Sequence, residues 1–259
     1  MIRYWLTPPQ DPEREEQVKA ICIVYEEAAE RTKQGEMTVS TDELTGVQAL
    51  ERKHPGLPLA VGKVERREFE YLRHGTRSFI LSRDIVTGRL LAPACGPTRT
   101  EADFLAHLQA VIATQPEVLR WHIVCDQLNT HQSESLVYWV AQLSGIDADL
   151  GVKGERGILA SMASRAAFLS DPSHFVVFHY TPKHSSWMNQ IEIWLSILVR
   201  KLLKRGSFSS VEDLQAKVLA FIDYYNRTMA KPFQWTYQGK ALTAQASKNA
   251  VSLCTSFLC

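Results

Sequence analysis

The sequence predicts an α/β protein built on a mixed five-stranded sheet with helices on both faces. Short apolar runs of strand length alternate with longer segments in which apolar residues recur every three or four positions, as on one face of a helix. Two strand-like runs flank Thr87 and Gly88, which is typical of an antiparallel hairpin. The runs 120–126 and 175–180 are each followed by a helical pattern, as in parallel strands joined through helices.

Length and composition are those of an ordinary globular chain. The 259 residues fit one large domain or two small ones, with 45% hydrophobic and 22% charged residues. No apolar run reaches the roughly 18 residues of a membrane span, and the first residues lack a signal-peptide pattern. The five cysteines form no Cys-x-x-Cys pair, which argues against structural zinc and disulfides and favours a cytoplasmic protein. A net charge of +1 confines any nucleic-acid surface to a local patch.

The first part of the chain predicts one helix and three strands. Asp11 and Pro12 are typical of a helix start, and Gly35 of a helix end. The predicted elements are a helix at 12–33, a strand at 37–42, loop and short turns at 44–66, and strands at 76–84 and 89–94.

The second part alternates helices with strands. The predicted elements are a helix at 101–114 capped by Thr100, a strand at 120–126, a helix ending near 143, a strand at 175–180, a long helix capped by Ser185 or Ser186 that runs to 205, and a helix from Ser209 or Ser210 to 226. Residues 146–173 are broken by glycines and predict a surface insertion that adds no strand to the central sheet and lies near the sheet edge where its two flanking segments end. Trp187 and Trp194 fall on the apolar stripe of the long helix and are expected in the core.

Three acidic residues fall where open α/β sheets place their sites. Asp42 and Asp126 end predicted strands, and Glu192 lies near the start of the helix after the last strand. Carboxylates that converge repel one another unless cations hold them, and oxygen ligands select Mg²⁺ or Mn²⁺. Two such ions suit displacement at phosphorus, so this pattern favours phosphodiester chemistry. For Glu192 by itself, a solvated position beside the apolar stripe is the alternative.

Basic residues gather about two helical turns beyond Glu192. Arg200, Lys201, Lys204 and Arg205 end the long helix with no acid between them. Cations at a helix C-terminus complement the helix dipole, and four together can also bind phosphate. A solvated helix end is the alternative reading.

The chain resembles bacterial insertion-sequence transposases of the mariner-like superfamily. The first block of likeness is Val39-Ser-Thr-Asp42-Glu43, followed by Gln48-Ala-Leu-Glu-Arg52, His54-Pro-Gly-Leu-Pro58 and Arg73-His-Gly-Thr76. The second block is Val124-Cys-Asp126-Gln-Leu-Asn129-Thr-His131. The third is Phe178-His-Tyr-Thr-Pro182 with Ser186-Trp-Met-Asn189-Gln-Ile-Glu192, and the likeness continues through 204–214, Asn226 and 231–235.

The resemblance implies an RNase H-like fold with a DDE active site, in which Asp42, Asp126 and Glu192 bind two Mg²⁺ or Mn²⁺ ions. Such enzymes hydrolyse phosphodiesters at element ends and join the freed 3′-hydroxyl to target DNA, commonly at a TA step. The expected partners are therefore DNA and a second copy of the chain, with no membrane and no small-molecule cofactor. The residues expected to contact DNA are Asn129, His131, Lys183, Arg200, Lys201, Lys204 and Arg205; orienting its loop is the alternative for His131.

The chain departs from the family pattern in three places. The separation between Asp126 and Glu192 is longer than in many members, Gln127 stands where Asn is common, and the N-terminal helix-turn-helix region of the family is not seen. The expected division is a linker helix at 1–36, an RNase H-like catalytic domain at 37–230 with its insertion at 146–173, and a tail at 231–259. Two other functions stay open: a stand-alone RNase H-like nuclease that cuts without joining, and a catalytically idle DNA-binding or protein-interaction remnant.

Overall fold

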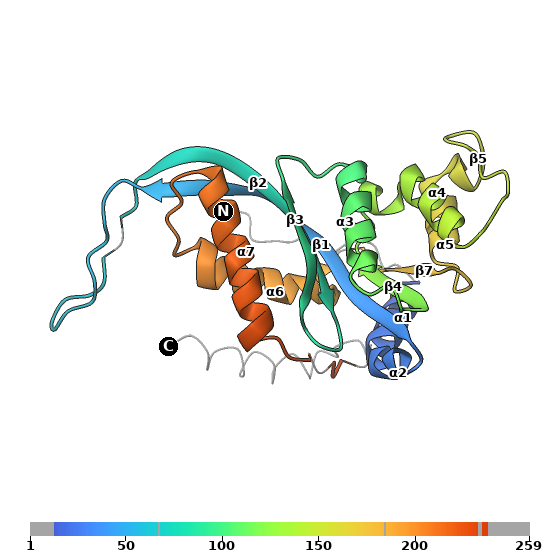
Figure 1. The fold of residues 1–259 in the computed structure, drawn as a ribbon, viewed down its shortest axis with the longest axis horizontal. Coiled ribbons are helices and arrows are strands. Elements are labelled where there is room, and N and C mark those ends of the chain that lie inside the picture. The colour runs from blue at the N-terminus through green and yellow to red at the C-terminus, as the bar shows by residue number, and fades with distance from the viewer. Residues whose placement is uncertain (1–12, 67, 184, 233–234, 238–259) are drawn as a thin grey trace.

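A computed structural model describes residues 13–66, 68–183, 185–232 and 235–237. A five-stranded sheet in the order β3-β2-β1-β4-β7 forms the centre of the molecule (Figure 1). Its strands are β1 (Glu36–Arg52), β2 (Tyr71–Asp84), β3 (Leu90–Gly96), β4 (Arg120–Cys125) and β7 (Val176–Tyr180). β1, β2 and β3 are antiparallel neighbours, whereas β4 runs parallel to both β1 and β7. The predicted mixed five-stranded sheet is confirmed.

Helices cover both faces of this sheet, as predicted. The α-helices are α1 (Arg14–Glu26), α2 (Ala28–Lys33), α3 (Glu101–Ala113), α4 (Glu134–Leu143), α5 (Met162–Leu169), α6 (Ile191–Leu198) and α7 (Val211–Thr228). α3, α4 and α5 share one core with inward residues of β4 and β7, whereas α6 and α7 pack on the opposite face of β2. α1 packs on that second face too, against Val124 of β4. Because β4 is covered on both faces, its residues from Trp121 to Cys125 are all buried, which explains why apolar residues stand at consecutive positions there.

The sheet extends further from the body than the sequence pattern predicts. The prediction of loop and turns at 44–66 is wrong for its first part, because β1 continues to Arg52 and pairs there with Tyr71 at the start of β2. Figure 1 shows this outer part of β1 and β2 as a two-stranded ribbon that passes over α6 and α7. Its side chains are mostly half-buried or exposed, so the segment lacks the apolar pattern of a core strand. A register shift follows Leu44, where Gly46 adopts a positive φ of 63°.

The insertion at 146–173 adds no strand to the central sheet, as predicted. Its two short strands, β5 (Gly151–Val152) and β6 (Arg156–Gly157), pair only with each other among the described residues. Its helix α5 lies against the 3-10 turn η1 (Asn129–Gln132), and the buried Arg165 Nε donates to the carbonyl of Gln132 at 2.7 Å. The insertion therefore supports the loop that follows Asp126.

Both predicted long helices are interrupted. The N-terminal pattern divides at Glu27 into α1 and α2. The helix predicted from Ser185 or Ser186 instead begins at Ile191, after the 3-10 turn η3 (Ser186–Met188) and an extended Asn189, and it ends in the π-helical turn η4 (Val199–Leu203). Trp194 is buried as predicted, but Trp187 is 49% exposed, so its predicted place in the core is wrong. Trp187 lies on the separate 3-10 turn and so leaves the apolar stripe of the helix.

No helix among the described residues is long and apolar enough to cross a membrane. The last residues of the predicted tail, 238–259, lie outside the described residues. The turn at Thr87 and Gly88 and the caps at Thr100 and Ser210 are present as predicted.

Candidate active site

Asp42 on β1 and Asp126, the residue directly after β4, lie level with each other on neighbouring parallel chain segments. The last β1–β4 pair is Ser40 with Val124, and each aspartate follows two residues later. β1 does not end at Asp42 as predicted, but its pairing with β4 ends two residues earlier, at Ser40. The two side chains therefore emerge where β1 and β4 separate, at the carboxyl end of β4.

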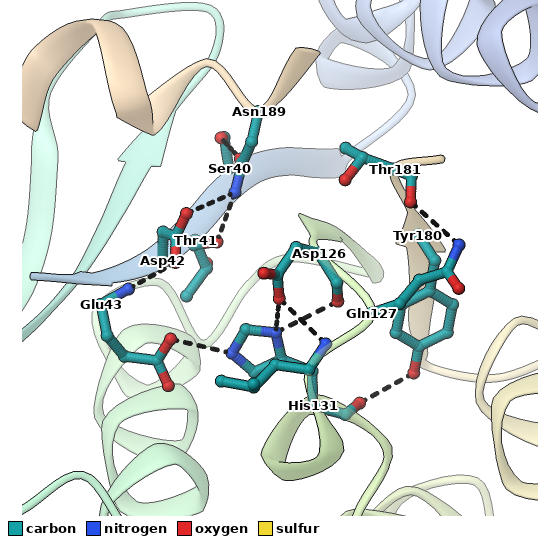
Figure 2. Close-up of polar contacts among 11 residues, drawn as sticks. Ser40, Thr41, Asp42, Glu43, Asp126, Gln127, His131, Tyr180, Thr181 and Asn189 are labelled. Carbon is teal, nitrogen blue, oxygen red and sulfur yellow. Dashed lines mark hydrogen bonds and ion pairs between the residues drawn. The ribbon is translucent and has the colours of Figure 1, made fainter. Parts of the chain in front are cut away.

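Glu192 is brought to the same place by a polar connection between α6 and β1. Asn189 is fully buried, and its Nδ2 donates to Asp42 Oδ2 at 3.2 Å and to the carbonyl of Thr41 at 3.0 Å. The Ser40 hydroxyl donates to Asn189 Oδ1 and accepts from the amide of Ile191, the first residue of α6. The first turn of α6, which carries Glu192, is thus fixed against Asp42 (Figure 2).

The acidic cluster is short of positive charge around Asp42. Burial raises the pKa of Asp42 to about 7. A hydrogen bond from the amide of Glu43 opposes this rise, while the charges of Asp126, Glu43 and Glu192 add to it. Burial, and then the charge of Asp126, also raises the pKa of Glu192. Carboxylates that raise one another's pKa are near neighbours without a compensating cation.

Asp126 differs because His131 neutralises it. The Nδ1 of His131 lies 2.7 Å from Asp126 Oδ1, and its Nε2 lies 3.2 Å from Glu43 Oε2 (Figure 2). Burial would raise the pKa of Asp126, but the hydrogen bond and positive charge of His131 outweigh this, and the pKa is lowered. Burial would likewise lower the pKa of His131, but hydrogen bonds to Asp126, Cys125 and Glu43 raise it well above its usual value.

The donor set suits a hard divalent cation. Asp42, Asp126 and Glu192 offer carboxylate oxygens only. The pKa of Asp42 is raised mainly by burial and further by the neighbouring carboxylates, whose negative charge a cation would offset. The side chains as they stand do not enclose an ion: within the described ranges, no three His, Cys, Asp or Glu side chains are close enough to hold one. The chemistry of the residues therefore fits a metal site.

The basic residues predicted to contact DNA divide into two groups. Glu192, Arg200 and Lys204 line one cleft of about 510 Å³, together with Glu43. Lys201 and Arg205 are exposed nearby on the same segment, and neither lines that cleft.

The other predicted DNA contacts lie elsewhere. Lys183 lines a different cleft, between α1 and α5, and Asn129 is exposed at the start of η1. His131 is 0% exposed, so the prediction that it contacts DNA is wrong. Its ring is enclosed by Phe104 and the two carboxylates, which leaves the alternative reading, that it orients its loop.

Glu43 and Asn189 were not assigned roles from the sequence. Both stand inside the blocks of family likeness, each close to a predicted catalytic residue. The sequence offers one signal for Asn189, a polar residue three positions before Glu192. Because that position lies inside the predicted helix, it gave no indication of a contact with β1. The link from Glu43 to His131 spans 88 positions and leaves no local pattern.

Comparisons with known proteins identify a family and similar folds. The family model described as DDE superfamily endonuclease matches residues 37–215. A crystal structure of a pre-cleavage Mos1 transpososome is similar at a TM-score of 0.50 and 12% identity, over 98% of this chain and 66% of that chain. The Mos1 strand transfer complex has a TM-score of 0.47 and 12% identity over 88% and 60% of the two chains. The catalytic domain of Mos1 mariner transposase has a TM-score of 0.47 and 12% identity over 86% and 90%.

These likenesses concern the fold. At 12% identity the first of these structures supports the RNase H-like α/β architecture, and this chain spans 66% of its length. No protein with a curated description matches the sequence. The family model, in contrast, covers well over half of the chain, including Asp42, Asp126 and Glu192. This chain belongs to the DDE superfamily of endonucleases.

Proposed function

We propose that this chain is the catalytic domain of a mariner-like transposase. It hydrolyses phosphodiester bonds at the ends of its element and joins the freed 3′-hydroxyl to target DNA. The observation that carries the proposal is the meeting of Asp42, Asp126 and Glu192 at one sheet edge, with the pKa of Asp42 raised to about 7. Membership of the DDE superfamily supports the same chemistry.

Asp42, Asp126 and Glu192 would hold Mg²⁺ or Mn²⁺, two ions in the full site. When bound, such ions activate the attacking oxygen and stabilise the leaving oxygen at phosphorus. The chain itself supplies the orientation of the ligands: Asn189 fixes Asp42, and His131 fixes Asp126.

DNA enters along the cleft that contains Glu192. Arg200 and Lys204 line that cleft and contribute phosphate contacts beside the carboxylates, with Lys201 and Arg205 adding positive charge nearby. Lys183 and Asn129 contact DNA on the other side of Asp126. Phosphate contacts of this kind position the duplex without reading its sequence.

The similar Mos1 structures are described as a transpososome and a strand transfer complex. For this chain we likewise infer strand transfer, element-end and target DNA as partners, and a second copy of the chain in the assembly. The proposed division is a linker helix at 1–36, a catalytic domain at 37–230 and a tail at 231–259, in a cytoplasmic protein.

A joining assay tests the proposal. Purified protein is incubated with Mg²⁺ or Mn²⁺, a supercoiled target plasmid and a precut duplex carrying the inverted repeat that flanks the gene. Joined product in wild type and none in Asp126→Asn supports the transposase. Nicking without joining indicates a stand-alone nuclease, and Mn²⁺ binding without either reaction indicates an idle remnant.

A further inference from the structure

His131 is a buried side chain whose two ring nitrogens both face acceptors. Nδ1 is 2.7 Å from Asp126 Oδ1 and 3.1 Å from the carbonyl of Asp126, and Nε2 is 3.2 Å from Glu43 Oε2. A carbonyl and two carboxylates supply only acceptors, so each nitrogen carries a hydrogen. His131 therefore joins Glu43 to Asp126 through two N–H donors (Figure 2).

Glu43 is a poor choice of residue for stability alone. Its side chain is 3% exposed, and its Oε1 has no hydrogen-bond partner in the part of the chain that the structure describes. Burying a carboxylate with one oxygen unsatisfied is costly, and a buried ion pair is on balance often no more stable than an apolar replacement. Retaining this arrangement points to a task beyond folding.

The hydrogen bonds of the Asp126 carboxylate indicate what this arrangement does. Both hydrogen bonds described for its carboxylate fall on Oδ1, from His131 Nδ1 and from the amide of Leu128 at 3.0 Å. The other oxygen is turned toward Asp42 in Figure 2. Fixing one oxygen in this way sets the direction in which the other is offered.

His131 is itself held in place by its surroundings. Its ring lies against Phe104, with ring centroids 4.3 Å apart, and its carbonyl accepts a hydrogen bond from the Tyr180 hydroxyl at 2.8 Å. Glu43 directly follows Asp42 on β1, so the link also ties the two aspartate-bearing strands together.

We propose that His131 is a positioning residue: its Nδ1–H holds Asp126 in its metal-binding orientation, and Glu43 secures the buried His131 ring in the fold. Neither residue is a metal ligand in this role. The role rests on the proposed function, since it presumes that Asp126 is a metal ligand. Outer partners of this kind typically change metal affinity by about 10- to 100-fold when they are removed.

Two substitutions of the same residue separate the two hydrogen bonds. In His131→Asn the amide nitrogen takes the place of Nδ1, which keeps the donor to Asp126 and loses the contact with Glu43. In His131→Gln the amide nitrogen takes the place of Nε2, which keeps Glu43 and loses Asp126. Glu43 is 3% exposed and Asp126 is 44% exposed, so losing the Glu43 contact costs more stability.

The measurement is Mn²⁺ binding to the purified full chain by calorimetry, with unfolding of the metal-free variants by urea. If His131 positions Asp126, His131→Asn is the less stable of the two variants but binds Mn²⁺ with an affinity within about threefold of wild type. His131→Gln is the more stable variant but binds Mn²⁺ at least about tenfold more weakly than wild type. Equal Mn²⁺ affinities, or affinities that follow the order of stability, would overturn the proposal.

Failure of the proposed function looks different. If wild type and Asp126→Asn bind Mn²⁺ equally, or wild type does not bind it, the acidic cluster is not a metal site and both proposals fall together. If wild type binds Mn²⁺ and cleaves DNA while both His131 variants match it, only the positioning role is lost.

Discussion

Replacing Asp42 with asparagine should make the metal-free protein more stable above pH 7. The folded-state pKa of Asp42 is about 7 against an ordinary value of 3.8, so the folded protein binds a proton that the unfolded chain has released. The stability associated with this proton is fully present below about pH 4 and is lost as the pH rises through 7. Asparagine carries no charge, so the variant escapes this loss.

The size of the effect follows from the same values. A rise from 3.8 to about 7 corresponds to an upper limit of about 4 kcal/mol, at about 1.4 kcal/mol per pKa unit. Part of this is offset, because the carboxamide places an NH₂ group against either the Glu43 amide or Asn189 Nδ2, at a cost of roughly 1–3 kcal/mol. The expected net stabilisation at pH 8 is about 1–3 kcal/mol, and it should shrink or reverse at pH 5.

Urea unfolding in EDTA at pH 5 and pH 8 measures this free energy of unfolding. Asp223→Asn serves as the control, because that carboxylate is 66% exposed in a helical pair with Arg227, and its removal should change stability by less than about 0.5 kcal/mol at either pH. An Asp42→Asn variant less stable than wild type at pH 8 would refute the electrostatic reasoning.

Three further predictions follow from the site. Asp126→Asn should abolish Mg²⁺-dependent cleavage, and unchanged cleavage in a plasmid-nicking assay would show the triad to be misassigned. Unlike Asp42→Asn, it should also destabilise the metal-free protein by about 1–3 kcal/mol, because it removes the negative charge that pairs with buried His131. The double variant Arg200→Ala, Lys204→Ala should lower the salt dependence of the DNA-binding constant by the equivalent of about two phosphate contacts. The control double variant Lys153→Ala, Arg156→Ala removes the same charge from an exposed surface and should leave that dependence unchanged. Binding itself should be weak and sequence-tolerant, so that a preference above about a hundredfold, or roughly 2.7 kcal/mol, for terminal repeats over scrambled duplexes in competition would reveal an unrecognised reading element.

The sheet and two of its acidic residues could be predicted because local pattern determines them. Strand-length apolar runs mark β4 and β7, and parallel strands bring Asp42 and Asp126 to one edge whatever the details of packing. Repulsion among the carboxylates, which the sequence pattern predicts, does not extend to Asp126, because His131 already compensates that carboxylate. His131 lies in the same block of family likeness as Asp126, but its second partner, Glu43, lies in the block around Asp42, so local pattern does not reveal the link.

Segments outside the core were harder to predict for a physical reason. The outer part of β1 lacks the pattern of a core strand because only a few of its side chains, those of Leu44, Val47 and Ala49, face the core shared with α6 and α7, while most of the others are partly or fully exposed. The start of α6 was placed too early because Ser185 and Ser186 are good caps, whereas the chain uses Asn189 to bind Ser40 and Asp42. A tertiary hydrogen bond outweighs a local preference here, and it moves Trp187 out of the helix.

The most direct test of the central claim is anomalous diffraction from crystals soaked with Mn²⁺. The account predicts manganese bound by carboxylate oxygens of Asp42 and Asp126, with Glu192 completing the same site. Manganese at other residues with none at this edge, under conditions where the protein cleaves DNA, would contradict it.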